Sequence, residues 1–433
     1  FLYLTLPEPV TEYRFAADMP AGPCLVGIAF LNDHFDAETD EDRNLYVVSL
    51  TISGATPMAE PPSVKKLTDR AIREHRMGTL IVETKPGATV KVRQLRHEFR
   101  FGTAVATHLF TDRTDEKTQQ QFRRILVDNF NAIVFENAFK WPQYERAAGE
   151  PDPTVVERML DFAEDHDLFV RGHCLFWANG RRVPDWAKDL DDAALRKAID
   201  RRIRRDVARY AGRIDEYDVN NEMLDHRYFS QRLGSDIRVH MFKLAHEIDP
   251  TAPMYLNDYG VLAGGKLNRY ERQIQWFLDQ GAPVGGIGCQ GHFGRRVAPF
   301  LTMKHVLDRL AKFDLPITVT EFDVTAPTEQ RKAADLEKFY RVCFAHPAVE
   351  GILMWGFWDK AHWRPKAALW RGDDFEPTPA AHAYRRLLFE EWWTDFEGKA
   401  DADGRCEVPA YFGAHRVEMD GKTLDVDLRR ADG

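Results

Sequence analysis

The stretch IDEYDVNNE, residues 214–222, decides the fold of the chain. It predicts a short strand over Ile214–Asn220, followed directly by the polar residues Asn221 and Glu222. Seven further short strands are expected, and nearly every one likewise ends at polar or aromatic residues: Phe99–Val105, Ala132–Glu136, Phe169–Cys174, Pro253–Asp258, Gly285–Gln290, Pro316–Glu321 and Ile352–Phe357.

Amphipathic helices are expected between these strands. The clearest are Leu195–Tyr210, Ile237–Ile248, Leu267–Leu278 and Leu336–Phe344. Another opens at Thr154, where a capping box is expected. Strands that alternate with helices predict a parallel α/β sheet, and eight such units predict a (β/α)8 barrel, or TIM barrel. A doubly wound open sheet is the alternative, because strands are easily miscounted in a sequence.

The chain divides into four parts by sequence pattern. Residues 1–58 predict a β-rich segment and 59–75 a linker. Residues 76–395 predict the barrel with leading β-strands, and 396–433 a C-terminal β-extension. The barrel is therefore expected to carry a small β-rich region on each side.

Charge and composition exclude several classes of function. The formal net charge of −9 leaves no basic excess to neutralise phosphates, so no nucleic acid partner is expected. No apolar run reaches the roughly 18 residues of a membrane span, so no membrane partner is expected either. The five cysteines lie far apart and predict no disulfide framework. Because the chain begins at Phe1 and not at Met, the lack of a signal peptide says nothing about secretion.

Residues of catalytic type gather at the ends of the predicted strands. In a barrel these ends converge on one face, where active sites lie. Packing alone gives no reason to place polar groups at the same end of most strands. The candidates are Glu136, Asn137, Lys140, His173, Trp177, Asn221, Glu222, Tyr259, Gln290, His292, Glu321, Asp323, Trp355 and Trp363.

Two carboxylates stand out, Glu222 after strand four and Glu321 at the end of strand seven. Cleavage of a glycosidic bond needs an acid for the leaving oxygen and a nucleophile or base on the other face of the sugar. Asn221 is placed to bond a sugar 2-hydroxyl, and His292 to bond Glu321. Asp323, two residues along the same strand, is expected on the same side as Glu321, where it would hold His292.

Two other patterns are set aside. The GxGxxG match at 286–291 lies inside the sixth strand, whereas a dinucleotide site needs it between a strand and a helix. No HExxH or HxH occurs, so a metal-dependent hydrolase is not expected. The basic run Arg201–Arg205 is interpreted as the solvated face of an amphipathic helix.

Six motifs at the strand ends are similar to those of one known family. They are FENAFKW at 135–141, RGHCLFW at 171–177, YDVNNE at 217–222, GIGCQGH at 286–292, TEFD at 320–323 and WGFWDK at 355–360. Together they resemble the motifs of glycoside hydrolase family 10, the barrel xylanases. The third- and fourth-strand motifs are closest to the plant-like branch of that family.

The resemblance implies a retaining double displacement on xylan, a plant cell-wall polysaccharide, with no cofactor required. Glu321 would attack the anomeric carbon, while Glu222 would protonate the leaving oxygen and later deprotonate water. The two carboxyl groups should then lie about 5–5.5 Å apart. Such an enzyme is expected to be secreted or periplasmic, because its substrate is an external polymer.

The same resemblance assigns sugar contacts. Glu136, Asn137 and Lys140 would bond hydroxyls on the non-reducing side. His173, Trp177, Asn221, Gln290 and His292 would line the cleavage subsite, and Tyr259, Trp355 and Trp363 would offer ring faces. One departure matters: many members follow the strand-three Trp with His and then Gln, but here the sequence at 178–182 is ANGRR.

The N-terminal segment has a resemblance of its own. FLND at 30–33 and DRNL at 42–45 resemble the closing half of a calcium-dependent xylan-binding β-sandwich. The oxygen ligands that Ca²⁺ prefers would come from Asn32, Asp33, Asp42 or Asn44. An acidic turn between two strands is the alternative, and so short a segment is expected to be an incomplete module.

Two alternative functions stay open. One keeps the mechanism but changes the substrate to cellulose or mixed-linkage β-glucan. The other is a carbohydrate-binding protein that keeps the cleft without catalysis, which the presence of both Glu222 and Glu321 disfavours.

Overall fold

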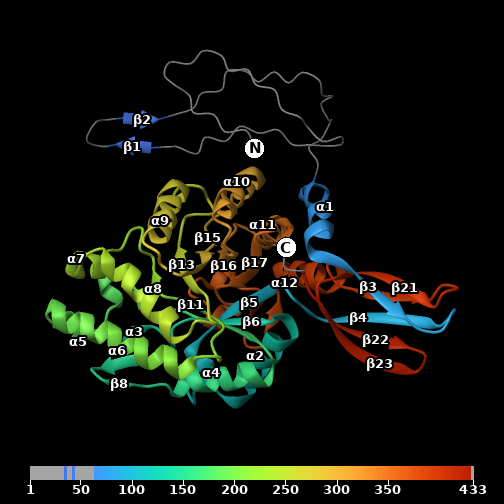
Figure 1. The fold of residues 1–433 in the computed structure, drawn as a ribbon, viewed down its shortest axis with the longest axis horizontal. Coiled ribbons are helices and arrows are strands. Elements are labelled where there is room, and N and C mark those ends of the chain that lie inside the picture. Colours follow the sequence, from blue (N-terminus) through green and yellow to red (C-terminus); the bar gives the residue numbers. More distant parts are fainter. Residues whose placement is uncertain (1–33, 37–40, 44–62, 431–433) are drawn as a thin grey trace, which may run out of the picture.

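The computed structural model describes residues 34–36, 41–43 and 63–430. Its centre is a ring of eight parallel strands with helices outside (Figure 1). The strands are β5 (Arg100–Val105), β6 (Ala132–Phe135), β9 (Phe169–Gly172), β11 (Glu216–Asp218), β13 (Met254–Asp258), β14 (Val284–Cys289), β16 (Ile317–Val324) and β17 (Val349–Met354). The ring closes because β17 pairs with β5 and β14 pairs with β16. The predicted TIM barrel is confirmed, and the open-sheet alternative is wrong.

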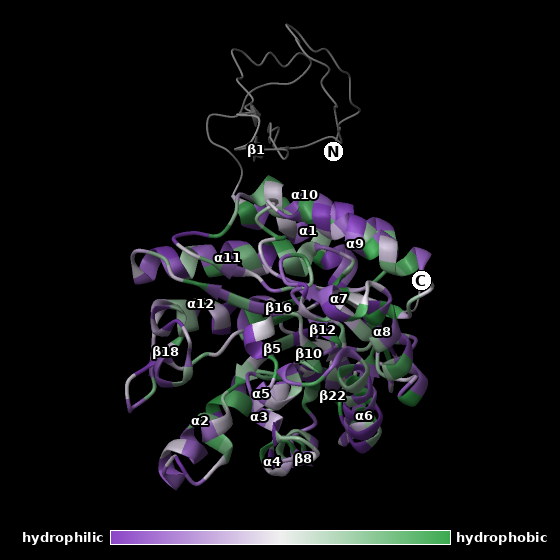
Figure 2. Cartoon of the chain, turned by 90° about the vertical axis from the view of Figure 1, so that its left-hand side faces the viewer, coloured by the Kyte–Doolittle hydropathy of each residue, from purple (hydrophilic) through white to green (hydrophobic). Residues whose placement is uncertain are grey.

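One main helix follows each strand of the ring. These helices are α2 (Glu116–Asn129), α4 (Thr154–Asp165), α6 (Asp192–Tyr210), α8 (Asp236–Ile248), α9 (Leu267–Asp279), α10 (Phe300–Leu310), α11 (Glu329–Ala345) and α12 (Pro379–Arg386). Hydrophilic and hydrophobic residues alternate along them, as the apolar stripe of a helix packed on a sheet requires (Figure 2). No helix among the described residues is long and apolar enough to cross a membrane.

One local prediction about helices is wrong, and a second is only partly right. Thr154 is the first residue of α4 and does not cap it; Pro153 holds the cap position, and Asp152 accepts from the Thr154 N–H at 3.1 Å. The run Arg201–Arg205 is only partly a solvated face, because Arg202 is fully buried. The Arg202 guanidinium donates to backbone carbonyls of the loops beneath α6, which would otherwise lie buried without partners.

A small β-subdomain lies at one side of the barrel (Figure 1). It contains strands from both ends of the barrel sequence: β3 (Met77–Glu83), β4 (Thr89–His97), β20 (Asp395–Lys399), β21 (Arg405–Tyr411), β22 (Gly413–Met419) and β23 (Lys422–Leu428). β4 lies between β20 and β22, and β3 pairs with β21. Buried valines, among them Val82, Val90 and Val408, form its own apolar cluster. The sequence predicts strands at both ends but not their mutual pairing.

The helix α1 (Val64–Arg76) connects to this subdomain and covers part of the segment predicted as a linker. Ser63 caps its first turn by accepting from the Lys66 N–H. At its other end the buried Arg76 guanidinium donates to the carbonyls of Phe344, His346 and Val349. These three hydrogen bonds fix α1 against the end of α11 and the start of β17.

Candidate active site

Glu222 lies at the carboxyl end of the fourth barrel strand, directly after the two-residue strand β12 (Asn220–Asn221). Its backbone has φ of +61°, in the left-handed region that residues other than glycine rarely adopt. Such a conformation costs on the order of 1–3 kcal/mol and persists only where the surroundings impose it. Here the Glu222 N–H donates to the Asn257 carbonyl at 3.0 Å, which holds the turn and directs the side chain.

The Glu222 carboxyl group is buried and accepts two hydrogen bonds from neutral donors. Trp177 Nε1 donates to Oε2 at 2.7 Å, and Gln290 Nε2 donates to Oε1 at 2.9 Å. His226, four residues further along the chain, places Nε2 at 3.4 Å from Oε2. Each carboxyl oxygen therefore has a fixed position.

Glu321 lies within β16 and has a different set of partners. Asn257 Nδ2 donates to Oε1 at 3.0 Å, and His292 Nε2 lies 3.0 Å from Oε2. Burial alone raises the pKa of Glu321, but the hydrogen bond from His292 and the charges of His173 and His292 outweigh it and lower that pKa. Glu321 is therefore held as a carboxylate.

His292, in the short strand β15 (His292–Phe293), stands between two carboxylates. Its Nδ1 lies 2.9 Å from Asp323 Oδ2, and its Nε2 faces Glu321. Burial opposes the charged ring, but hydrogen bonds to Asp323 and Glu321 raise the pKa of His292 to about 9. The ring is therefore an imidazolium that donates from both nitrogens. Asp323 also accepts from Trp363 Nε1 at 2.7 Å and from Arg364 at 3.0 Å.

Two residues connect the two glutamates. Asn257 binds Glu222 through its carbonyl and Glu321 through its amide. Gln290 binds the Glu222 side chain and accepts from the Glu321 N–H at 2.7 Å through its carbonyl. Glu222 and Glu321, almost a hundred positions apart in the chain, therefore share two partners at one face of the barrel.

Asn257 is absent from the predicted site residues, although the sequence places it at the end of strand five. Its Nδ2 also donates to Asn221 Oδ1 at 3.0 Å. Thr320 Oγ1 donates to Asn257 Oδ1 at 2.7 Å, which orients the amide so that its N–H₂ faces Glu321. Its position at a strand end could have suggested it, but its contacts are not visible in the sequence.

His173 lies beside Glu321, with Nδ1 at 4.0 Å from Oε1. The same nitrogen lies 2.8 Å from Asp218 Oδ2, and Asp218 in turn pairs with the fully buried Arg171. Burial opposes the charge of Asp218, but Arg171 and His173 outweigh it and lower its pKa. The Trp355 ring meets the His173 ring edge-on at 5.0 Å between centroids. A buried ion-pair network inside the barrel therefore orients His173.

The ammonium group of Lys140 lies near Trp177 and Trp355. Its Nζ donates to Asn137 Oδ1 at 3.1 Å and lies 5.0 Å from the ring centroid of Trp177 and 5.5 Å from that of Trp355. Glu136 is partly buried, and burial raises its pKa despite the opposing charge of Lys140. These residues therefore lie on the side of the site that Trp177 and Trp355 line.

Tyr259 and Trp363 lie further out. The Tyr259 hydroxyl donates to Asp225 at 2.6 Å, and Lys266 Nζ lies over its ring at 3.1 Å from the centroid. Trp363 is 51% exposed and packs against the His292 ring at 4.8 Å between centroids. Trp363 thus joins the site through His292 and Asp323, whereas the contacts of Tyr259 are with Asp225 and Lys266.

The predicted calcium ligands Asn32, Asp33 and Asn44 lie outside the described residues. Asp42 belongs to the strand β2 (Glu41–Arg43), which pairs antiparallel with β1 (His34–Asp36). Among the residues that the structure does describe, no group of three or more His, Cys, Asp or Glu side chains is arranged to hold a metal ion.

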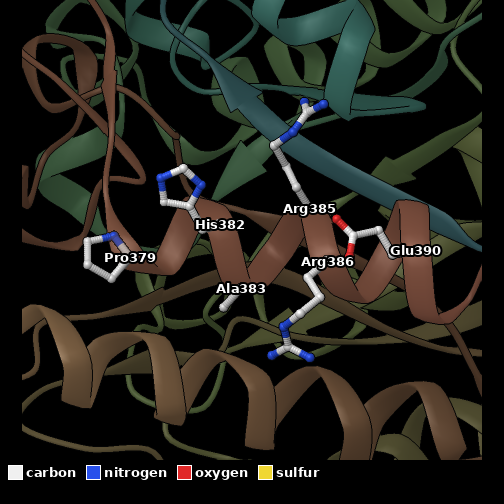
Figure 3. A pocket seen from close by; sticks show the side chains of 6 residues that line it. All are labelled: Pro379, His382, Ala383, Arg385, Arg386 and Glu390. Atoms are coloured by element: carbon white, nitrogen blue, oxygen red, sulfur yellow. The ribbon is translucent and has the colours of Figure 1, made fainter.

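A surface hollow lies over α12 and the turn that follows it (Figure 3). Its lining residues are Pro379, His382, Ala383, Arg385, Arg386 and Glu390. The Arg386 guanidinium already pairs with Glu337, and Arg385 donates to Asn129. None of the predicted site residues lines this hollow, so it is separate from the carboxylate pair.

Comparison with known proteins gives two family matches. Residues 92–386 match glycosyl hydrolase family 10, and residues 7–66 match a Ca-dependent xylan-binding carbohydrate-binding module. Both resemblances seen in the sequence are thereby confirmed.

Two relatives are each 35% identical to this chain over more than three quarters of its length. Endo-1,4-beta-xylanase 1 of Arabidopsis thaliana is 35% identical over 339 residues, covering 77% of this chain and 34% of its own. The anti-sigma-I factor RsgI6 of Acetivibrio thermocellus is 35% identical over 352 residues, covering 80% of this chain and 45% of its own. The chain therefore spans less than half the length of these two curated relatives.

Solved structures share the barrel. Xylanase 10B from Thermotoga petrophila, crystallised in complex with xylobiose, superposes with a TM-score of 0.63 at 26% identity. The match covers 68% of this chain and 95% of that one. With residues 92–386 matched and this barrel in common, the chain belongs to glycosyl hydrolase family 10.

Proposed function

We propose that the chain hydrolyses internal β-1,4 bonds of xylan with retention of configuration, with Glu321 as nucleophile and Glu222 as acid/base. The observation that carries this proposal is the pair of buried carboxylates that share Asn257 and Gln290 as partners. Family membership supports the reaction class, and the xylanases among the relatives support the substrate.

In the first step Glu321 attacks the anomeric carbon, and Glu222 gives a proton to the leaving glycosidic oxygen. The lowered pKa of Glu321 supports this role, because the nucleophile must be ionised. In the second step Glu222 takes a proton from water, which releases the sugar from Glu321. A relay of this kind expects the two carboxyl groups about 5–5.5 Å apart.

The neighbouring residues would bind the sugars. His173, Trp177, Asn221, Gln290 and His292 would line the cleavage subsite, and Asp323 would hold His292. Glu136, Asn137 and Lys140 would bond hydroxyls on the non-reducing side. Tyr259, Trp355 and Trp363 would offer ring faces, and the exposed ring of Trp363 next to His292 supports its place at the edge of the site.

The N-terminal segment would bind the same polymer. Residues 7–66 match a module described as Ca-dependent and xylan-binding. The oxygen-rich side chains Asn32, Asp33, Asp42 and Asn44 fit the ligand preference of Ca²⁺, which would have a structural role there. A plant cell-wall xylan as substrate implies that the protein is secreted or periplasmic.

The test is to incubate the purified chain with xylan, cellulose and mixed-linkage β-glucan and to measure new reducing ends. We expect release from xylan, with products that carry the β-anomeric form at early times by NMR. Release from cellulose or β-glucan alone would change the substrate, and early α-anomers would contradict the retaining mechanism.

A second candidate is carbohydrate sensing without turnover. It is favoured by one observation: a relative that matches 80% of this chain is named an anti-sigma-I factor and not a xylanase. If the intact chain binds xylo-oligosaccharides but releases no reducing ends from any β-glycan, this second function replaces the first.

A further inference from the structure

The segment ANGRR, residues 178–182, forms a rigid turn next to Trp177. Gly180–Arg182 is a single 3-10 turn. The Asn179 side chain accepts from the Arg181 N–H at 3.0 Å, and its carbonyl accepts from the Arg182 N–H at 2.8 Å. The positions at which the two arginine side chains leave the backbone are therefore fixed.

Arg182 lies one aromatic ring away from the acid/base. Its Cζ stands 4.9 Å from the ring centroid of Trp177, and the same indole donates its N–H to Glu222 at 2.7 Å. Cations are attracted to the face of a Trp ring at this distance. The guanidinium therefore lies on a ring that directly contacts the Glu222 carboxyl group.

The charge of these arginines is not neutralised within the protein. Both residues are exposed, and among the described residues neither guanidinium has a carboxylate within ion-pair distance. Asp185, the next acidic residue along the chain, pairs with Lys188 at 2.7 Å. In a protein of net charge −9, an unpaired cation one ring away from Glu222, with a second arginine at the preceding position, favours an anionic ligand.

We propose that Arg182, supported by Arg181, recognises a carboxylate carried by the polysaccharide itself, that is, a uronic acid group attached to the sugar chain bound beside Trp177. This inference rests on the proposed function. A planar guanidinium matches a carboxylate through two parallel hydrogen bonds, which a neutral sugar hydroxyl does not offer. The contact selects which stretch of xylan enters the site, and the bond cleavage steps are unchanged.

The experiment compares two oligosaccharides of the same backbone, one bearing a uronic acid and one in which that carboxyl group has been reduced to an alcohol. For the intact chain we expect kcat/KM to be higher on the uronate substrate. For Arg182→Gln we expect the ratio of the two values to fall about 10-fold, because one charge-assisted contact is lost. Arg182→Lys should give an intermediate ratio, since it keeps the charge but loses the planar fork.

Arg201→Gln serves as the matched control. Arg201 is an exposed arginine on the outer helix α6, so the substitution removes the same charge away from the site. We expect it to leave the ratio unchanged. An increase in salt should lower the uronate preference of the parent chain but not that of Arg182→Gln, because the contact is partly exposed.

A parent chain that treats both oligosaccharides alike, or an Arg182→Gln variant that loses the same factor on both, would overturn the inference while leaving the xylanase proposal intact. No cleavage of either oligosaccharide or of unsubstituted xylan would instead overturn the proposed function. In that case calorimetry still tests the inference, by comparing the affinities of the two oligosaccharides for the parent chain and for Arg182→Gln. The N-terminal segment is identical in both proteins, so any oligosaccharide that it binds does not affect the difference between them.

Discussion

Glu222 and Glu321 are almost equally buried, with 9% and 4% of their surface exposed, but their carboxyl groups contact different partners. The two hydrogen-bond donors to Glu222 are the neutral N–H groups of Trp177 and Gln290, and His226 Nε2 lies 3.4 Å from Oε2. Glu321 faces the imidazolium of His292, which Asp323 holds from behind. The two carboxyl groups therefore differ in the charge of their hydrogen-bond donors and not in depth.

This difference separates the two chemical tasks. A neutral N–H can donate to a carboxyl oxygen whether or not the group carries a proton. An imidazolium favours the charged form of its partner, so the Glu321 pocket favours the carboxylate throughout. The first arrangement suits a group that must release and recover a proton, and the second suits a nucleophile. Five substitutions test this comparison.

Removal of the proposed nucleophile should have the largest effect. Glu321→Ala leaves no oxygen to bond the anomeric carbon, so turnover on every substrate should fall on the order of 10⁴- to 10⁶-fold. Reducing-end release from xylan and from an activated aryl xyloside measures this. If this variant kept more than a few per cent of the parent activity, the nucleophile assignment would be wrong. Glu271→Ala, on an outer helix, is the control.

Removal of the acid/base should depend on the leaving group. For Glu222→Ala we expect a loss of about 10²- to 10⁴-fold on xylan, since general acid catalysis is missing. An aryl glycoside with an acidic leaving group needs no proton, so its first step should be largely spared. Stopped-flow release of the phenol separates the two cases. An equal loss on polymer and aryl substrate would contradict the acid role.

Loss of the imidazolium should move the pH profile. His292 lowers the pKa of Glu321 by stabilising its carboxylate, so His292→Gln should raise that pKa. The acidic limb of kcat/KM, which needs Glu321 ionised, then shifts to higher pH. The lost charge-assisted hydrogen bond should lower turnover by about 10- to 100-fold. Asp323→Asn should shift the limb in the same direction but less, and an unmoved limb in both variants would refute the assigned role of His292.

Loss of a neutral donor to Glu222 should have the smallest effect. Trp177→Phe keeps an aromatic ring but removes the N–H that binds Oε2. We expect kcat to fall by about 2- to 10-fold, because one neutral hydrogen bond contributes roughly 0.5–1.5 kcal/mol. A fall in kcat as large as that of His292→Gln would contradict the proposed difference between the surroundings of Glu222 and Glu321.

Much of the barrel and its carboxylate pair could be predicted because both depend on local pattern. The strands are short, and polar residues follow nearly all of them. Glu222 and Glu321 can therefore be picked out as candidates from the sequence alone. The relation of Glu321 to Asp323 follows from the two-residue period of a strand, which turns both side chains to one side. His292 then lies between them, with its two nitrogens 3.0 and 2.9 Å from their oxygens.

What could not be predicted depends on contacts between distant residues. The amide of Asn257 faces Glu321 because Thr320, 63 positions away, orients it. Arg202 resembles the other arginines of its run, yet it lies buried because it faces carbonyls of two other loops. Neither partner can be identified from the residues next to it in the sequence.

The β-subdomain joins the two ends of the barrel sequence in one small sheet at the side of the barrel. The Thr394 N–H donates to the Gln94 side chain, 300 positions earlier, so this sheet is complete only after the whole barrel has been synthesised. A shortened chain that spans only 92–386 would lack every strand that pairs with β4, and would expose Val92 to water. We therefore expect such a truncation to aggregate or to be cleaved by proteases, and engineered truncations should retain residues 63–430.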